Sequence, residues 1–188
     1  MRHRLPLLTV FVAAAALAAG CGDTASVLRD RAAPAGSPSC SVAEGCVPRT
    51  PLVALDGQAT DLASVVRGRT TIVSLWATWC EACAREIPAL ERLSSLASAR
   101  GDALVVRIAV GEPHEAVAAF IRSRGVLIPQ LVDESFQLAD ALGERRVPST
   151  LVIDRTGRVV FREGALDASG LAAFRNALGT RESGGKAD

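Results

Sequence analysis

The residues best suited to chemistry in this chain are its five cysteines, two of which stand three positions apart as Cys80 and Cys83. Cys80 follows a β-branched, apolar run over residues 70–76, which predicts a buried strand, and it opens a segment with helical periodicity. Free backbone N–H groups and the helix dipole stabilise a thiolate at such a position. Cys83 lies one turn deeper. Two unequal thiols of this kind suit thiol-disulfide exchange, in which the outer thiolate attacks and the inner thiol resolves.

Three other interpretations of this pair are open. A zinc site would need two more ligands, for which Cys40 and Cys46 are a loose substitute. Haem attachment would need histidine directly after the second cysteine, where Ala84 stands. A purely structural disulfide needs no further residue. The strand-then-helix context favours the redox interpretation.

Composition excludes several other kinds of chemistry. The chain has 188 residues, 49% of them apolar and 22% charged, as in soluble globular proteins. Its net charge of +1 without a basic block argues against nucleic-acid binding. Lys186 is the only lysine, and His3 and His114 are the only histidines. These counts argue against Schiff-base chemistry, a multi-histidine metal site and a Ser/His/Asp triad, and we expect no cofactor.

The first residues have the features of an export signal. Residues 1–4 are basic, residues 5–20 are mostly apolar, and Cys21 follows directly. The segment over residues 17–21 resembles the bacterial lipobox, although Ala18 stands where the usual pattern has leucine. We therefore expect a signal peptide over residues 1–20 and lipidation of Cys21. A retained membrane anchor and ordinary cleavage after Ala18 are the alternatives.

The remaining chain divides by composition. We expect a lipidated, flexible tether over residues 21–39. After Cys21, the segment over residues 22–39 is rich in Ala, Gly, Ser and Pro, as flexible linkers are. Residues 40–180 are expected to form one domain, and residues 181–188 a polar tail. Cys40 and Cys46 predict a structural disulfide; a second redox pair is the alternative.

Apolar periodicity and turn residues predict alternating strands and helices, and so an α/β sheet that ends in an antiparallel hairpin and a helix. In the predicted helix over residues 80–99, one apolar face is expected from Ile87, Leu90, Leu93 and Leu96. The expected strands cover residues 52–55, 70–76, 104–110, 131–132, 150–153 and 158–161, and the other expected helices begin near residues 113, 135 and 167.

From residue 51 to residue 178 the sequence resembles the thioredoxin superfamily, and within it the TlpA/ResA-like membrane-anchored thiol-disulfide oxidoreductases. The resemblance implies a thioredoxin fold: a central mixed sheet flanked by helices, with an N-terminal β-hairpin extension and an inserted helical segment. The matching segments occur in the family's order. They are Leu55-Asp56-Gly57-Gln58, Val66-Arg67-Gly68-Arg69, Trp76 to Cys83, Glu86 with Pro88, Val110-Gly111-Glu112, and Val147-Pro148-Ser149-Thr150.

The resemblance assigns a role to Glu86, which stands where the family carries a buried acid. Its position three residues after Cys83 places it on the same helical face. A carboxylate with a raised pKa there could take the Cys83 proton. A solvent-facing glutamate paired with Arg92 is the alternative. Ser74 stands where thioredoxin has a buried aspartate, which makes Glu86 the only candidate acid beneath the cysteines.

The family's cis-proline loop corresponds to Val147 and Pro148. The resemblance implies that this loop faces the cysteines and that the Val147 backbone pairs with the substrate chain. A strand-entry proline with an ordinary trans bond is the alternative. Trp79 is expected to line the site, and Trp76 to belong to the core.

The resemblance implies an exported, monomeric lipoprotein that faces the periplasm or another extracytoplasmic space. It would reduce disulfides of other proteins, such as apocytochrome c, with electrons from a membrane thiol-disulfide carrier. One rival function is that of a thiol peroxidase, but Thr78 is two places before Cys80 instead of three. The other is a copper or zinc binding lipoprotein, which would depend on sulfur ligands.

Overall fold

Seven strands form one mixed sheet in the order β2-β1-β5-β4-β3-β6-β7 in a computed structural model, which describes residues 45–179. The strands are β1 (Pro51–Ala54), β2 (Ala59–Asp61), β3 (Thr70–Trp76), β4 (Ala103–Val110), β5 (Gln130–Asp133), β6 (Ser149–Ile153) and β7 (Val159–Glu163). The helices are α1 (Leu62–Val66), α2 (Glu81–Arg100), α3 (His114–Arg124), α4 (Gln137–Leu142) and α5 (Ala168–Gly179).

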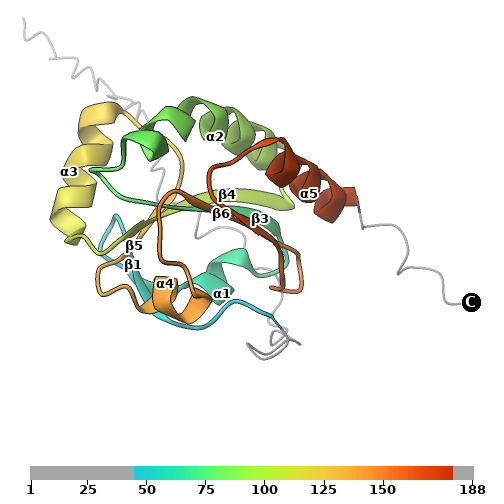
Figure 1. Cartoon of the computed structure of the whole chain (residues 1–188), viewed down its shortest axis with the longest axis horizontal. Coiled ribbons are helices and arrows are strands. Elements are labelled where there is room, and N and C mark those ends of the chain that lie inside the picture. Colours follow the sequence, from blue (N-terminus) through green and yellow to red (C-terminus); the bar gives the residue numbers. More distant parts are fainter. Residues whose placement is uncertain (1–44, 180–188) are drawn as a thin grey trace, which may run out of the picture. The chain divides into compact units, whose positions relative to one another are not determined.

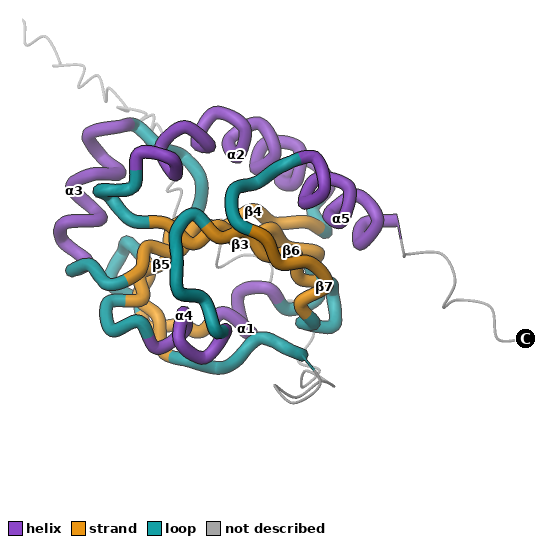
Figure 2. Tube along the Cα trace, viewed as in Figure 1, coloured by secondary structure: helices purple, strands orange, loops and turns teal. Residues whose placement is uncertain are grey.

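The two central strands, β3 and β4, are buried along their whole length and run parallel, from the pair Thr70–Ala103 to the pair Trp76–Ala109. Their apolar, β-branched composition suits a strand covered on both faces. Helices α2, α3 and α5 cover one face of the sheet, and α1 and α4 cover the other (Figures 1 and 2). Parallel β3 and β4 end at the same edge, where α2 begins.

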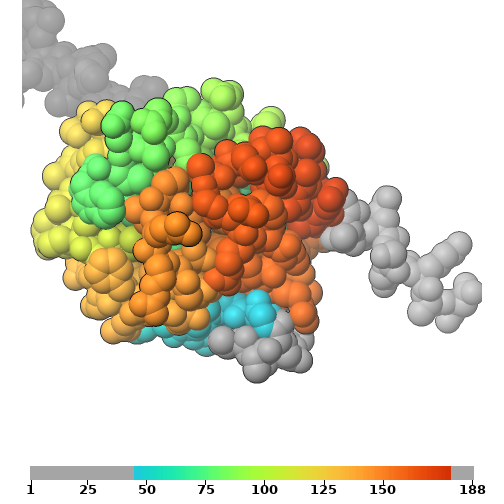
Figure 3. Space-filling model, viewed as in Figure 1, coloured from blue at the N-terminus to red at the C-terminus, as the bar shows by residue number. Residues whose placement is uncertain are grey.

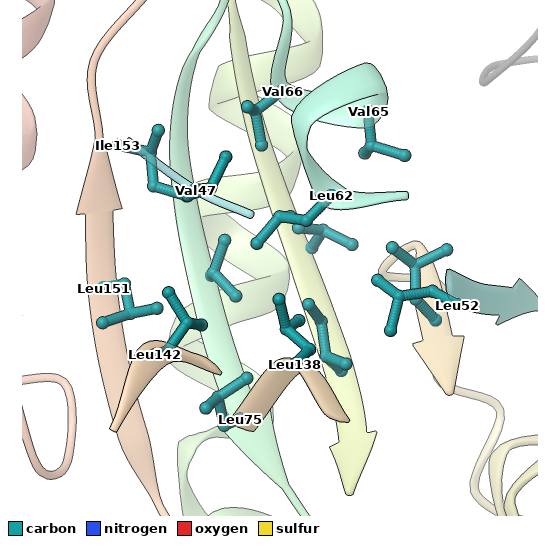
Figure 4. Close-up of a cluster of buried hydrophobic side chains, with 14 of the residues drawn as sticks. Val47, Leu52, Leu62, Val65, Val66, Leu75, Leu138, Leu142, Leu151 and Ile153 are labelled. Atoms are coloured by element: carbon teal, nitrogen blue, oxygen red, sulfur yellow. The ribbon is translucent and has the colours of Figure 1, made fainter. Parts of the chain in front are cut away.

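The core has two halves, one on each face of the sheet. Alternate residues of each central strand contribute to each half, since successive side chains of a strand point to opposite faces. Leu75, Leu138, Leu142 and Leu151 lie together between the sheet and the helices α1 and α4 (Figure 4). Trp76, Leu90 and Phe174 belong to the half beneath α2, α3 and α5.

Helix α2 begins after Cys80 and ends at Gly101, whose left-handed φ of 78° is readily adopted only by glycine. Leu90 is buried, as expected, but Leu96 is 65% exposed. The expected apolar face was therefore wrong at its far end. Residues three apart in an α-helix are about 60° short of a full turn from each other. Over the three steps from Ile87 to Leu96 this adds up to about half a turn, so the two side chains face opposite sides of the helix. Ala97 is buried in its place.

The expected N-terminal hairpin is formed by β1 and β2, which pair antiparallel, and β1 also pairs with β5. The expected closing hairpin is β6 with β7. The inserted segment contains α3. The sequence did not predict β2 or α1, because three and five residues are too short to show a period. Helix α1 is capped by Asp61, whose side chain accepts from the Ser64 N–H.

The first described residues, 45–47, pair with the turn between β6 and β7. Cys46 forms an isolated antiparallel bridge with Arg158, the Val47 N–H donates to the Gly157 carbonyl at 3.0 Å, and the Val159 N–H donates to the Gly45 carbonyl at 3.0 Å. Cys46 is buried and disulfide-bonded. Its expected partner Cys40 lies outside the described residues, so that pairing stays a prediction.

Several expectations concern the ends of the chain. The signal peptide over residues 1–20, the lipidation of Cys21, the tether over residues 21–39 and the tail over residues 181–188 all lie outside the described residues. Between residues 45 and 179, no helix has the length and apolar character that crossing a membrane requires.

Candidate active site

Cys80 and Cys83 form a disulfide with an S–S distance of 2.02 Å. Cys80 is the N-cap residue of α2, and its Sγ accepts the backbone N–H of Cys83 at 3.1 Å. Both cysteines are buried, Cys80 with 7% of its surface exposed and Cys83 with none. A thiolate on Cys80 would face the free N–H groups and the positive end of a 20-residue helix, both of which stabilise negative charge.

The loop before Cys80 is held by a residue from the end of β4. The Thr78 N–H donates to one carboxylate oxygen of Glu112 at 2.7 Å, and the Thr78 hydroxyl donates to the other. The Cys80 N–H donates to the Ala77 carbonyl at 3.1 Å, which closes a turn into the helix. The site is therefore built at the carboxyl edge of β3 and β4.

The bond between Val147 and Pro148 is cis, as the resemblance implied. Strand β6 pairs antiparallel with β3, and the pair Leu75–Ser149 places Pro148 at the same edge of the sheet as the start of α2. In the space-filling view the segment before β6, in orange, lies on the same face as the start of α2, in green (Figure 3). Glu144 supports this loop by accepting from the Ser149 hydroxyl at 2.7 Å.

A cavity of about 250 Å³ lies between the loop before Cys80 and the loop before Pro148. Its walls include Trp79, Phe136 and Val147, and its rim carries Arg145 and Arg146. Trp76 is 1% exposed and belongs to the core, as predicted, whereas Trp79 is 73% exposed.

Phe136 was not predicted as part of the site. It adopts a left-handed φ of 58°, which is rare for a residue with a side chain, and its ring occupies the space where a Cβ at position 111 would stand. Gly111, with a φ of 70°, therefore makes room for the ring. No local sequence signal marks a left-handed phenylalanine.

Glu86 faces the segment before α5 and is not fully in solvent. It is half-buried, and one of its carboxylate oxygens accepts the Leu166 N–H at 2.7 Å. Desolvation raises its pKa above the usual 4.5; the bond from Leu166 and the charge of Arg107 oppose that rise. The expected direction of the shift is confirmed.

Arg107 is the site's other unpredicted residue. Its side chain is fully buried beneath α2, and desolvation lowers its pKa to about 10, while Glu86 and Glu91 oppose this change. A single charged residue in the otherwise apolar run over residues 103–110 is the signal that could have revealed it.

Glu81 is the neighbour of Cys80, and a negative charge next to the cysteine opposes thiolate formation. Its side chain is 89% exposed and pairs with Arg85 at 2.9 Å. Solvent and the arginine therefore screen its charge, and its effect on Cys80 is small.

Within residues 45–179 no group of three or more His, Cys, Asp or Glu side chains is placed to hold a metal ion. The structure places Trp79, Cys80 and Cys83 at the start of α2 and the loop of Val147 and Pro148 at the same edge of the sheet, whereas Glu86 lies further along α2 and contacts the segment before α5. Its arrangement, with a disulfide at the start of the helix after a central strand and a cis-proline loop beside it, defines a protein of the thioredoxin fold.

The chain belongs to the Redoxin family, whose model matches residues 29–178. It is similar to the thiol-disulfide oxidoreductase ResA of Geobacillus thermodenitrificans, with 32% identity over 93 residues, and of Bacillus subtilis, with 31% over 121 residues. The match to the Geobacillus protein covers 50% of this chain and 53% of the relative. The match to the Bacillus protein covers 64% of this chain and 66% of the relative. The chain thus spans about half to two thirds of the length of these relatives.

Among solved structures, a thiol:disulfide interchange protein of the thioredoxin family from Chlorobium tepidum has a TM-score of 0.59 and 26% identity. That match covers 71% of this chain and 96% of the other. The exposed lipoprotein thioredoxin Etrx1 from Streptococcus pneumoniae has a TM-score of 0.58 at 24% identity, and the match covers 69% of this chain and 97% of the other. Both likenesses agree with the fold described above.

Proposed function

We propose that this protein is a thiol-disulfide oxidoreductase that reduces disulfides of other proteins through Cys80 and Cys83. The observation that carries the proposal is the disulfide at the N-terminus of α2, in which Cys80 keeps a small exposed fraction of 7% and Cys83 is fully buried. This asymmetry suits a two-step exchange. The similarity to ResA supports the same activity.

The exchange would proceed through a mixed disulfide. The Cys80 thiolate attacks one sulfur of the substrate disulfide, and the other substrate sulfur leaves as a thiolate that takes up a proton from solvent. The Cys83 thiolate then attacks Cys80, releases the second substrate thiol and forms the disulfide seen here. Glu86 is the candidate acceptor for the Cys83 proton, because it is on the same face of α2 and its pKa is raised.

The substrate chain would lie beside the cis-proline loop. The Val147 backbone precedes the cis bond at the edge of the site and can pair with an extended chain, while Trp79 offers an exposed apolar surface. The cavity lined by Trp79 and Val147 gives room for a substrate side chain beside the cis-proline loop.

We place this protein outside the cytoplasm, as a monomer attached to the membrane through lipid on Cys21, in keeping with the signal-like first 20 residues. The resemblance to the TlpA/ResA-like proteins suggests apocytochrome c or other extracytoplasmic proteins as substrates and a membrane thiol-disulfide carrier as electron donor. A peroxidase is less well supported, because the Thr78 hydroxyl donates to Glu112 instead of facing the Cys80 sulfur.

Insulin reduction by the wild type, Cys80→Ser and Cys83→Ser proteins tests the activity. Cys80→Ser should abolish reduction, whereas Cys83→Ser should accumulate a mixed disulfide through Cys80. A Cys40→Ser/Cys46→Ser protein is the control and should keep its activity if that pair is a structural staple. Full activity of Cys80→Ser would reject the proposal.

The reducing direction is tested separately by equilibrium with glutathione. We expect a potential below about −200 mV, closer to thioredoxin than to the oxidant DsbA. A value near that of DsbA would assign this protein to disulfide formation instead.

A further inference from the structure

Two large apolar side chains that are exposed, Trp79 and Phe136, line the cavity beside the cis-proline loop. Trp79 is 73% exposed and directly precedes Cys80, and Phe136 is 49% exposed and lies between β5 and α4. Aromatic side chains are enriched where proteins bind other proteins, and apolar groups gathered at one place on a surface mark such sites. The cavity therefore has the walls of a binding site for an apolar group.

The size of the cavity indicates what could enter it. Its volume is about 250 Å³, and its remaining apolar lining includes Leu75, Val110 and Ala139. Pockets that enclose a whole small-molecule ligand usually measure roughly 300–1,000 Å³. The cavity is smaller than that range, so it suits a single apolar side chain of a polypeptide.

The wall formed by Phe136 is held in place by the fold. The Phe136 N–H donates to the Asp133 carbonyl at 3.3 Å, and the backbone takes a left-handed φ of 58°. This conformation directs the ring into the space that Gly111 leaves open at the end of β4. The ring is therefore part of a preformed cavity.

The rim of the cavity carries positive charge. Arg145 and Arg146 both line it and are exposed, and neither forms an ion pair within residues 45–179. Two acids also line the cavity. Glu144 is paired with Arg162 at 2.8 Å, whereas Asp140 is exposed and has no ion pair in the described part of the chain. Two unpaired cations against one unpaired acid leave the rim with a net positive charge.

The arginines stand where a substrate chain would pass. They directly precede Val147, whose backbone we propose to pair with that chain. Successive residues of an extended chain are about 3.3 Å apart, so substrate residues a few places from the paired one lie next to the arginine side chains. A guanidinium binds a carboxylate through paired, charge-assisted hydrogen bonds. Acidic substrate residues would therefore provide the partners that Arg145 and Arg146 lack.

We propose that this cavity selects the substrate of the exchange. Trp79 and Phe136 receive an apolar side chain close to the substrate cysteine, and Arg145 and Arg146 bind acidic residues near it. The substrate class is an extended polypeptide segment in which a disulfide-bonded cysteine lies among apolar and acidic residues. The inference rests on the thiol-disulfide exchange proposed above and names the substrates of that same site.

The test uses the full chain in reduced form and three peptides whose cysteine is joined to thionitrobenzoate. In each peptide leucines flank the cysteine, and the outer residues are all glutamate, all glutamine or all lysine. Attack of Cys80 on the peptide sulfur forms the mixed disulfide and releases thionitrobenzoate, a good leaving group whose absorbance gives the second-order rate constant. The Cys80→Ser protein gives the background.

The glutamate peptide should react roughly tenfold faster than the lysine peptide at low salt, with the glutamine peptide between them. The difference should shrink in about 1 M salt, which screens exposed charges. Equal rates for the three peptides would overturn the proposal, and so would a faster reaction of the lysine peptide.

Reversal of the rim charge tests the two arginines. Arg145→Glu and Arg146→Glu should each lower the ratio of the glutamate rate to the lysine rate severalfold. Arg122→Glu is the matched control, because Arg122 is an exposed arginine in the last turn of α3 that also has no ion pair within residues 45–179. It should keep the wild-type ratio. An equal fall in the control would overturn the proposal, since any loss of positive charge would then have the same effect.

The apolar part is tested at Phe136. Phe136→Asn removes the ring and suits the left-handed backbone, whereas Phe136→Leu keeps an apolar wall. Phe136→Asn should slow the glutamate peptide severalfold more than a version with serines in place of the leucines, and Phe136→Leu should retain most of the preference for leucine. Thermal unfolding checks that each variant is folded. Equal slowing of the two peptides by Phe136→Asn would contradict the assigned wall.

Binding can also be measured without chemistry. Peptides with serine in place of cysteine are titrated into the oxidised protein, and the fluorescence of Trp79 reports the Kd. The glutamate peptide should bind more tightly than the lysine peptide, and equal Kd values would reject the inference. Failure of the reduced wild type to react with any of the cysteine peptides would instead reject the proposed function, whatever the Kd values are.

Discussion

Thr78 donates both its backbone N–H and its hydroxyl to the carboxylate of Glu112, which is 34 residues further along the chain. This pair connects the loop before Cys80 to the end of β4. The loop that presents the attacking sulfur is therefore supported by a residue outside the active-site motif.

Glu112→Gln should loosen this loop. The two Thr78 donors use different carboxylate oxygens, and in glutamine one of these is replaced by an NH2 group that cannot accept. The lost bond should lower the free energy of unfolding by about 1–3 kcal/mol. Insulin reduction should slow as well. Denaturant unfolding and the reduction assay check this, with Glu115→Gln, an exposed change two positions into α3, as the control. Equal effects of the two changes would contradict the assigned role.

Glu86 should make stability depend on pH. Its pKa is raised in the folded protein, so the carboxyl contributes most below its ordinary value of 4.5 and that contribution is lost as the pH rises through the folded pKa. Relative to the wild type, Glu86→Gln should therefore gain stability as the pH rises above the ordinary value of 4.5. Urea unfolding at several pH values measures the difference, and a difference that does not change with pH would contradict the burial argument.

Glu144 is expected to control substrate affinity through the cis-proline loop. It accepts from the Ser149 hydroxyl at 2.7 Å and pairs with Arg162 at 2.8 Å. Glu144→Ala should raise KM for a protein disulfide roughly two- to tenfold with little change in kcat, from the usual net value of one hydrogen bond. Glu144→Gln keeps an acceptor for Ser149 and should resemble the wild type. A fall in kcat alone would assign Glu144 to the chemical step instead.

Two leucines of α2 allow a matched test of the core. Leu90 is fully buried and Leu96 is 65% exposed on the same helix. Leu90→Ala should cost about 2–5 kcal/mol, whereas Leu96→Ala should stay within about 0.5 kcal/mol. Thermal or denaturant unfolding compares them directly. A large cost at Leu96 would indicate that this surface is covered in solution.

Much of the architecture could be predicted from the chain alone. The predicted strand over residues 70–76 matches β3 in full, and the helix predicted over residues 80–99 is α2 within a residue or two. Both depend on local features: a continuous apolar run for a strand buried on both faces, and a cap at each end of a periodic helix. Cys80, Cys83 and Pro148 could likewise be identified from spacing and resemblance, because their relation to these elements is local.

The contacts between distant residues required the tertiary structure. Thr78 meets Glu112, Gly111 makes room for the Phe136 ring, and Arg107 reaches the Cys83 carbonyl. None of these pairs is marked by neighbours in sequence, since they form only when the sheet order brings β3, β4 and the segment after β5 to one edge. Local energies decided which segments became strands and helices, and only the packing of those elements decided which charged and aromatic side chains surround the cysteines.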